Sequence, residues 1–497
     1  MKPSADGRTS CGAISRRGFL QAGCAAAAAA LAYPGAASAW QYQRPNIVFV
    51  FADQWRADAT GYAGDPNVRT PHIDALAEES VNFTNAVAGC PVCTPYRATL
   101  LTGQRPLTHG VFLNDVHLRA EVTSIAEVFA ADGYDTAYVG KWHVDGHGRS
   151  SWIPPERQQG FDYWKALECT HNYNESAYYA HDSPERLYWD GYDAIAQTRD
   201  VQEYIRSHDQ DRPFLLTLSW GPPHAPYGTA PEEYRAMYDP EDIELRPNVP
   251  YDKVEIARQQ LAGYYAHCTA LDDCVRDLLN TLDEEGIAED TIFVFTSDHG
   301  DMLHSQGEEK KQQPWEESIR VPFLLRYPRY LGREGKELEA PIDAQDVLPT
   351  LISLSKLALP GAPALTQRDY EFDGLDFADY IQGGPDPSEG AALLMCPHPF
   401  GQWQRERGGR EYRGLRTTRY TYTRTLDGPW LLFDNENDPY QLNNLVDDPD
   451  HADLQERLEA ELQRRLEAAG DEFLPGMAYV EKWGYELDDT GTVPYTW

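Results

Sequence analysis

The sequence predicts an α/β protein built on a mostly parallel β-sheet with helices on both faces, followed by a smaller α+β part with a short antiparallel sheet and a packed helix. Three observations support this fold class. Apolar runs of β-type residues alternate with helical segments through the first two thirds of the chain. At 497 residues the chain can bury a large core. The last quarter instead shows short strands separated by turn signals.

The first strand, residues 46–51, is a continuous apolar run, which indicates a strand buried on both faces. Similar runs predict three further strands, and helical segments lie between them. The predicted strands are 136–139, 214–219 and 292–296, and the predicted helices are 73–79, 124–131, 197–207 and 253–283.

Residues 150–192 have weak periodicity and many aromatic side chains, so we expect a long excursion over the surface. Such rings can stack on sugar rings, and they can equally pack loops onto the sheet. The sequence leaves both roles open.

A boundary is predicted in the Pro/Gly-rich stretch 357–390, which separates a larger part, residues 40–375, from a C-terminal part, residues 376–497. The C-terminal part is predicted to hold an antiparallel sheet with an amphipathic helix across it, and the tail after Tyr485 is expected to be a solvated extension. The strands are 393–396, 412–416, 419–424 and 430–433, and the helix is marked by Leu454, Leu458, Leu462 and Leu466.

The first 39 residues are predicted to be an export signal. Paired arginines at 16–17 precede the apolar run 22–32 and a small-residue cleavage site at 37–39, which is typical of twin-arginine export. The run is too short and alanine-rich to favour a membrane anchor, and Gln21 argues against lipid attachment at Cys24. We therefore expect a periplasmic or secreted protein without a membrane span.

The chain is strongly acidic, with a net charge of −36 that becomes −39 when the first 39 residues, with four basic residues and one acidic residue, are removed. This charge disfavours nucleic acid and anionic membranes as partners, and an anionic substrate needs a local cationic pocket. Cysteines are too sparse for a disulfide scaffold and have no zinc-site spacing, although one or two disulfides are compatible with export. The six beyond the signal are Cys90, Cys93, Cys169, Cys268, Cys274 and Cys396.

Polar or cationic residues follow four predicted strands. Because ligands of parallel sheets collect at the carboxyl ends of the strands, we expect these residues to form one site. An oxygen-rich set suits a hard divalent cation, calcium or magnesium, and its imidazole leaves manganese open. It comprises Asp53, Gln54, Asp298 and His299. A cationic set suits a tetrahedral oxyanion, and its histidines can move protons. It comprises Arg97, Lys141, His143, His224 and Lys311.

The stretch 90–103 contains a candidate nucleophile. Pro95 stands where a helix could begin, and Arg97 lies one turn beyond Cys93 on the same face. The helix dipole and the guanidinium would activate a thiol or hold an anion there. A lone cysteine of this kind is more often a buried cap residue, and only the four strand ends favour a functional role.

Residues 93–97, C-T-P-Y-R, followed by A-T-L-L-T-G, resemble the C-x-P-x-R signature of the formylglycine-dependent sulfatases of the alkaline-phosphatase-like superfamily. Further matches follow in the family's order over nearly the whole chain beyond the signal. They are F-A-D-Q, G-K-W-H, P-P-H-A-P-Y, S-D-H-G-D-M-L, K-x-x-x-W-E-E-S-I-R-V-P and D-P-Y-Q-L-N-N-L. The resemblance implies a catalytic sulfatase domain at 40–375 and a C-terminal subdomain at 376–497.

The resemblance also implies roles for single residues. Cys93 would be oxidised by a formylglycine-generating enzyme to formylglycine (3-oxoalanine), whose hydrate is the nucleophile, and Cys90 would be structural. The implied ligands of a divalent metal, best calcium, are Asp53, Gln54, Cys93, Asp298 and His299. Gln54 and His299 depart from the aspartate and asparagine that are frequent at these positions.

The cationic residues take the remaining implied roles. Arg97 and Lys141 would hold the hydrate, and His143 would take the proton whose loss releases sulfate. His224 and Lys311 would contact the sulfate and help to protonate the leaving oxygen. Lys311 is preferred to Lys310 because it has the family's spacing to Trp315 and Glu316.

Export and the aromatic content favour a sulfated polysaccharide or oligosaccharide as substrate, with His398, Trp403 and Arg405 as further candidate sugar contacts. The alternatives are an arylsulfatase for small aryl sulfates and a phosphodiester or phosphonate monoester hydrolase on the same scaffold. A sulfated-glycan-binding protein with an inactive site is a third alternative, against which the complete motif set argues.

Overall fold

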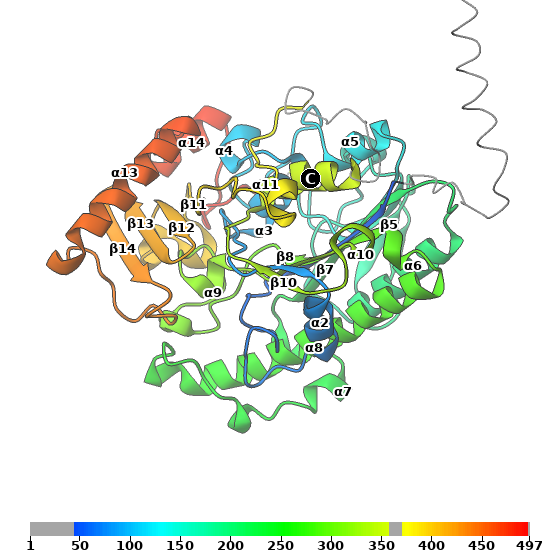
Figure 1. Ribbon diagram of the computed structural model, residues 1–497, viewed down its shortest axis with the longest axis horizontal. Coiled ribbons are helices and arrows are strands. Elements are labelled where there is room, and N and C mark those ends of the chain that lie inside the picture. Colours follow the sequence, from blue (N-terminus) through cyan, green and yellow to red (C-terminus); the bar gives the residue numbers. More distant parts are fainter. Residues whose placement is uncertain (1–43, 357–369, 496–497) are drawn as a thin grey trace, which may run out of the picture. The chain divides into compact units, whose positions relative to one another are not determined.

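The computed structural model describes residues 44–356 and 370–495 (Figure 1). The predicted export signal, including Cys24, and residues 357–369 of the Pro/Gly-rich stretch lie outside the described residues. Within the described ranges, every helix is too short or too polar to cross a bilayer.

A ten-stranded mixed sheet is the main element of the described chain. Its order is β10-β2-β9-β8-β1-β7-β3-β4-β5-β6. The central strands from β8 to β4 run parallel, whereas β9, β5 and β6 are antiparallel to their neighbours. The predicted class, a mostly parallel sheet, is confirmed at the centre of the sheet. The strands are β1 (Asn46–Asp53), β2 (Val81–Phe83), β3 (Asp135–Lys141), β4 (Tyr163–Leu167), β5 (Ala177–Ala180), β6 (Arg186–Tyr188), β7 (Phe214–Pro223), β8 (Thr291–Ser297), β9 (Phe323–Arg326) and β10 (Lys336–Leu338).

Helices cover both faces of this sheet because its central strands are apolar on both faces. In β1, Ile47, Phe49 and Phe51 pack in one core with α3, α5 and α11, and Val48 and Val50 pack in a second core with α2, α6 and α8. Figure 1 shows α3 and α11 on one side of the sheet and α2 and α8 on the other. The helices of this part are α2 (Pro71–Glu78), α3 (Cys93–Thr102), α4 (Pro106–His109), α5 (Ile125–Ala131), α6 (Asp193–Ser207), α7 (Glu232–Arg235), α8 (Val254–Glu284), α9 (Glu316–Ile319), α10 (Pro328–Leu331) and α11 (Ala344–Lys356).

The expectation of a surface excursion at 150–192 is wrong for much of that segment. β4, β5 and β6 extend the main sheet at one edge, and Trp164 and Tyr173 are fully buried. Tyr188 is an exception with 60% exposure. The strands have only three to five residues, too few for an alternating pattern to show in the sequence. Most of these rings therefore pack the segment onto the sheet.

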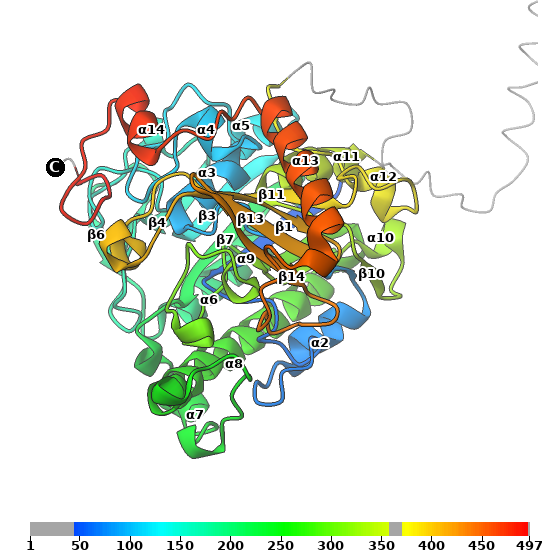
Figure 2. The same cartoon turned by 90° about the vertical axis from the view of Figure 1, so that its left-hand side faces the viewer.

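A second, four-stranded antiparallel sheet follows in the order β11-β12-β13-β14, as predicted (Figure 2). Leu458, Leu462 and Leu466 of α13 pack against Leu415 and Leu432 of this sheet. The division of the chain at residues 375 and 376 stays a prediction. The elements are α12 (Ala378–Ile381), β11 (Ala391–Cys396), β12 (Tyr412–Thr417), β13 (Tyr420–Thr425), β14 (Gly428–Asp434), α13 (Ala452–Ala468) and α14 (Gly476–Trp483).

The expectation of a solvated tail is wrong in part, because the tail packs on the large sheet while its acidic residues stay exposed. Leu487 and Val493 pack against the core of the large sheet, and the Tyr485 hydroxyl donates to the Gly110 carbonyl at 2.8 Å. The Thr492 hydroxyl donates to the Asn114 carbonyl at 2.7 Å. A few apolar and aromatic residues among the acidic ones are enough to return this tail to the large sheet.

The six described cysteines are all buried free thiols. Cys268 and Cys274 lie in the core on α8. Burial raises the pKa of the Cys90 thiol to about 12, which suits a structural residue.

Candidate active site

The carboxyl ends of four adjacent strands meet at one edge of the sheet. Asp53 ends β1, Lys141 ends β3, and Asp298 and His224 follow directly after β8 and β7. These strands are neighbours in the order β8-β1-β7-β3. β3 and β7 both run beyond their predicted ends, so Lys141, paired with Leu167, and Pro223, paired with Asp53, are held in the sheet rather than in loops.

Cys93 is the first residue of α3, which begins two residues before the predicted start at Pro95. Val92 caps the helix in an extended conformation, and Gly103, with φ of 67°, ends it in the left-handed region. All ten residues of α3 are buried. The side chain of Cys93 therefore lies at the positive end of the helix, held by a rigid, desolvated element.

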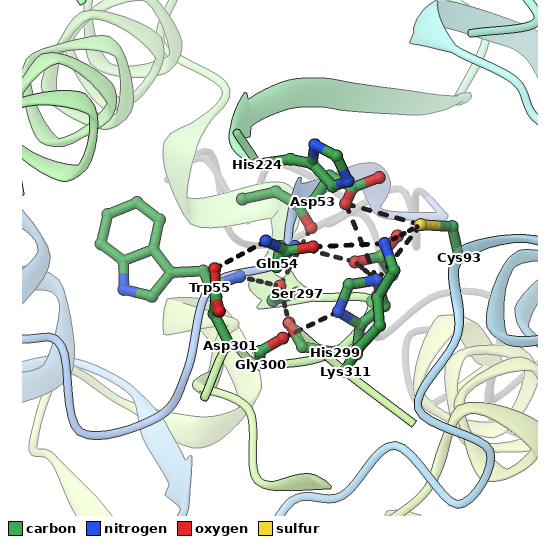
Figure 3. Close-up of polar contacts among 12 residues, drawn as sticks. Asp53, Gln54, Trp55, Cys93, His224, Ser297, His299, Gly300, Asp301 and Lys311 are labelled. Carbon is green, nitrogen blue, oxygen red and sulfur yellow. Dashed lines mark hydrogen bonds and ion pairs between the residues drawn. The ribbon is translucent and has the colours of Figure 1, made fainter. Parts of the chain in front are cut away.

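Three polar groups surround the Cys93 sulfur (Figure 3). Lys311 Nζ lies 2.8 Å from Sγ, His299 Nε2 3.2 Å and Asp53 Oδ1 3.6 Å. Burial opposes charge on the sulfur, but Lys141 and Lys311 outweigh it and lower the pKa of the Cys93 thiol well below its usual value. Position 93 is thus an electropositive, water-excluded point in the fold.

A set of metal-capable atoms lies around this point. Asp53, Cys93, Asp298 and His299 each offer one ligand atom, and these atoms all lie within 4.8 Å of one another. His299 Nδ1 lies 2.9 Å from the Gly300 carbonyl oxygen, an acceptor, so Nδ1 carries the proton and the Nε2 lone pair faces the carboxylates. The donor set, two buried carboxylates and one oriented imidazole, fits a divalent cation.

Gln54 lies at the edge of this set. Its Oε1 accepts from Lys311 Nζ at 3.2 Å, and its Nε2 donates to Asp301 Oδ2 at 2.6 Å. Its backbone N–H donates to Asp298 Oδ1 at 3.0 Å, with φ of 74°. These contacts leave the amide oxygen as the only part of the Gln54 side chain that can face a cation.

Arg97 and Lys141 balance the two carboxylates. Arg97 Nη2 donates to Asp53 Oδ2 at 3.0 Å and to Asp298 Oδ2 at 2.9 Å, and the guanidinium stacks on Phe51. Lys141 Nζ donates to Asp53 Oδ2 at 2.5 Å. In the described structure Arg97 therefore bonds to the predicted metal ligands rather than to Cys93.

The pKa values of the two carboxyl groups, Asp53 and Asp298, are shifted in opposite directions. Burial opposes charge on Asp53, but Lys141 and its other cationic neighbours outweigh it and hold the pKa of that carboxyl well below its usual range. Burial and then the charge of Asp53 raise the pKa of Asp298 to about 6. A cation placed between the carboxylates would offset their repulsion and favour the charged form of both.

Both histidines of the predicted cationic set contribute a ring to the site. His143 Nε2 lies 3.0 Å from Asp115 Oδ1, and its Nδ1 is buried without a hydrogen-bond partner among the described residues. His224 Nδ1 lies 2.8 Å from the carbonyl oxygen of Ala225, and Nε2 makes no hydrogen bond to another described residue. Burial and Lys311 lower the pKa of His224 well below its usual value, so this ring is neutral near pH 7.

Sequence reasoning missed several neighbours of these residues. The His171 ring is stacked on His224 with centroids 4.7 Å apart and planes at 5°. Asp301 accepts from Gln54 and from the Tyr227 hydroxyl. Asp301 stands inside the quoted S-D-H-G-D-M-L motif and could have been found there. Asp115 and His171 lie in loops without a pattern, so only the fold reveals them.

The expected sugar contacts near residue 400 are not supported for two of the three residues. Trp403 is 3% exposed and packs against Trp315 and Trp430. His398 is also buried, and Arg405 pairs with Glu411. Trp403 is thus part of a small core between strands, because an indole among other indoles gains more from burial than from solvent contact.

Comparison with known proteins gives a consistent family. The family model described as Sulfatase matches residues 45–357, and the one described as N-sulphoglucosamine sulphohydrolase, C-terminal, matches residues 307–468. An ulvan-active sulfatase of Formosa agariphila is 48% identical over 91% of this chain and 87% of its own length. An endo-4-O-sulfatase of Bacteroides thetaiotaomicron is 30% identical over 87% of this chain and 93% of its own.

A solved structure agrees with these relatives. The crystal structure of a putative sulfatase from Bacteroides fragilis superposes with a TM-score of 0.77 at 30% identity, and covers 90% of this chain and 100% of that one. The matching region includes both sheets, since it spans nearly all of the described residues.

Proposed function

This chain belongs to the sulfatase family, and on that premise we propose that it removes sulfate from a sulfated polysaccharide or oligosaccharide, with formylglycine made from Cys93 as nucleophile. The observation that carries the proposal is the position of Cys93. It begins a buried helix and faces Lys311, His299 and Asp53 at 2.8, 3.2 and 3.6 Å. A thiol in a merely structural role needs none of these charged neighbours.

The carbohydrate substrate is supported by the relatives. The Formosa agariphila protein is active on ulvan, a sulfated polysaccharide, according to its name. Its similarity extends over 91% of this chain, well beyond the residues around position 93. We infer that the present chain acts on a substrate of the same chemical class.

A divalent cation is implied by the family, and we propose calcium, with magnesium or manganese as alternatives. Asp53, Asp298, His299 and residue 93 would hold it, with the Gln54 amide oxygen at the edge. Such a cation would polarise the sulfate oxygens and neutralise charge that develops on them.

The charges of the site explain how an acidic chain binds an anion. Arg97 and Lys141 already neutralise the two carboxylates. A dication and Lys311 would then leave the pocket positive, although the whole chain carries a net charge of −36. This local field would draw a sulfate group into a buried site.

Residue 93 supplies the nucleophile in the proposed reaction. Formylglycine in its hydrated form provides one hydroxyl that attacks sulfur and a second hydroxyl whose deprotonation releases sulfate. Arg97 and Lys141 fix the carboxylates that face this residue. His143, whose Nδ1 has no partner among the described residues, accepts the proton from the second hydroxyl.

Lys311 and His224 act at the leaving group. Lys311 is 5% exposed, and its ammonium lies beside position 93, where it can bond a sulfate oxygen. His224 presents Nε2, which makes no hydrogen bond to another described residue, and this atom passes a proton to the departing sugar oxygen after it has taken one up. The low pKa of His224 means that the proton passes from Lys311 or water rather than from a resting imidazolium.

Maturation and location complete the proposal. A formylglycine-generating enzyme converts Cys93, and the twin-arginine signal in residues 1–39 directs export to the periplasm or beyond. The catalytic domain spans residues 40–375 and the C-terminal subdomain residues 376–497.

A substrate panel tests the function. We expect sulfate release from sulfated glycans, slower turnover of small aryl sulfates, and weak activity on matched phosphodiesters and phosphonate monoesters. Efficient turnover of aryl sulfates with no glycan desulfation would refute the carbohydrate assignment. Glycan binding without turnover, by a chain with unmodified Cys93, would instead favour a binding protein.

A further inference from the structure

We propose that Asp115 is a positioning residue that fixes the ring of His143, and that the C-terminal tail, through Tyr495, holds Asp115 in place. This inference rests on the proposed role of His143 as proton acceptor. Asp115 lies in the loop after α4, outside every quoted motif. It joins three parts of the chain that are far apart in sequence.

The carboxylate of Asp115 is surrounded by donors. His143 Nε2 lies 3.0 Å from Oδ1, and Arg149 Nη2 donates to Oδ2 at 3.2 Å. The Tyr495 hydroxyl donates to Oδ1, and Arg149 donates in turn to that hydroxyl. The side chains of Asp115 and His143 are 2% and 3% exposed. A buried carboxylate with this set of neighbours can only be an acceptor toward His143.

The proton of His143 is therefore held on Nε2, and Nδ1 is the atom left to exchange a proton. Nδ1 is buried without a partner among the described residues. The bond to Asp115 thus fixes the orientation of the ring and leaves Nδ1 as the nitrogen without a partner among the described residues.

The loop that carries Asp115 is bonded directly to the start of α3. The Asp115 backbone N–H donates to the Thr94 hydroxyl at 3.3 Å, and the Thr94 N–H donates to Asn114 Oδ1 at 3.2 Å. Asp115 and His143 have φ of 66° and 60°, which non-glycine residues seldom adopt. The backbone is held in this unusual conformation at both members of the pair, next to the residue that follows Cys93.

The tail closes this arrangement. The Thr492 hydroxyl bonds the Asn114 carbonyl at 2.7 Å, and Arg149 lies over the Tyr495 ring at 5.2 Å. The last described residues of the chain are therefore part of the support of the active site.

Two tyrosines of the same tail provide a matched test. Tyr495→Phe removes the hydroxyl that bonds Asp115, and Tyr485→Phe removes one that bonds the Gly110 carbonyl away from His143. In fully matured enzyme we expect kcat on a sulfated oligosaccharide to fall about tenfold in Tyr495→Phe, the effect of one hydrogen bond to a charged group, with KM unchanged. Tyr485→Phe should keep the wild-type kcat.

Asp115→Asn should have a larger effect. The asparagine amide must point its NH₂ group toward Arg149 or toward His143, and both of these neighbours are donors. We expect kcat to fall by about 10² to 10⁴ with melting temperature and formylglycine content unchanged. An equal fall in kcat in both tyrosine variants, or an effect on KM alone, would show that the tail has only a structural role. If Asp115→Asn fails to fold, the comparison of Tyr495→Phe with Tyr485→Phe still tests the inference.

A second readout is independent of activity, so it separates this inference from the proposed function. Long-range ¹H–¹⁵N spectra of wild-type protein labelled in its histidine rings, with His143 identified by its loss in His143→Gln, show which nitrogen carries a proton. We expect a protonated Nε2 at neutral pH. An unprotonated Nε2 would overturn the inference even in a fully active enzyme, and a protonated one would support it even if no sulfate ester were cleaved.

Discussion

The ammonium of Lys311 lies 2.8 Å from the sulfur of Cys93, while the adjacent Lys310 has φ of 61° and is more exposed. The turn between the two residues places only one of them at position 93. The spacing to Trp315 favoured Lys311 in the sequence, and the structure gives it a contact that fits this choice.

The lysine pair supplies the first prediction. Lys311→Ala should lower kcat by about 10² to 10³, as expected for a donor that stabilises charge in the transition state. Lys310→Ala is the matched control and should stay near wild type. Steady-state kinetics on a sulfated oligosaccharide measure both, and a larger loss in Lys310→Ala would exclude the proposed role of Lys311.

Metal removal supplies the second prediction. Chelation should abolish sulfate release and lower the melting temperature, because Asp53 and Asp298 then face each other without a cation. Calcium should restore both, and elemental analysis should find about one ion per chain, which Asp298→Asn loses. Full activity in metal-free protein would contradict the proposed site.

The central fold could be predicted because its strands are apolar on both faces. Residues 46–51 and 292–296 predict β1 and β8 within a residue or two, and the Leu454 to Leu466 spacing predicts α13. Short elements were not predictable: β4 to β6 and β10 have too few residues for a period to appear. The packing of the tail depends on contacts with Gly110 and Asn114, almost 400 positions away, which no local pattern encodes.

The candidate site was predictable to the extent that strand ends and motifs define it. Asp53, Lys141 and Asp298 follow strands, so their meeting follows from parallel order alone. The residues that hold these groups in position were not predictable, since Asp115 and His171 come from loops whose course depends on tertiary packing. The sequence therefore predicts the candidate site residues, and the structure adds the residues that orient them.

A stacked histidine pair supplies the third prediction. His171 is exposed and covers the buried His224 face to face at 4.7 Å. His171→Ala should lower kcat/KM by roughly threefold to tenfold, the contribution of one ring pair. His181 is an exposed histidine of the same segment that packs on Tyr163, and His181→Ala should be neutral. Equal effects of the two substitutions would argue against a role for the stack.

Acid stability supplies the fourth prediction. Burial and Arg119 lower the pKa of His109 to about 3, so the folded ring stays neutral where the unfolded one takes up a proton. Its contribution to stability is complete above about pH 6.5 and is lost as the pH falls toward 3, with about 2 kcal/mol lost between pH 7 and pH 5.

Urea unfolding of His109→Asn at pH 7 and pH 5 measures this contribution. The change in unfolding free energy between the two pH values should be about 2 kcal/mol smaller than in wild type. His181→Asn, at an exposed position, should leave that change as in wild type. An unaltered pH dependence in His109→Asn would show that the ring titrates normally.

The most direct test of the proposed mechanism is mass spectrometry of the peptide that contains Cys93, from enzyme produced in a host with a formylglycine-generating enzyme. We predict the mass of the aldehyde or its hydrate, in a fraction of chains that tracks the rate of sulfate release from the glycan. Two results would contradict the proposed mechanism. One is turnover by a preparation in which Cys93 is entirely the thiol, and the other is a lack of turnover in a preparation in which Cys93 is entirely converted.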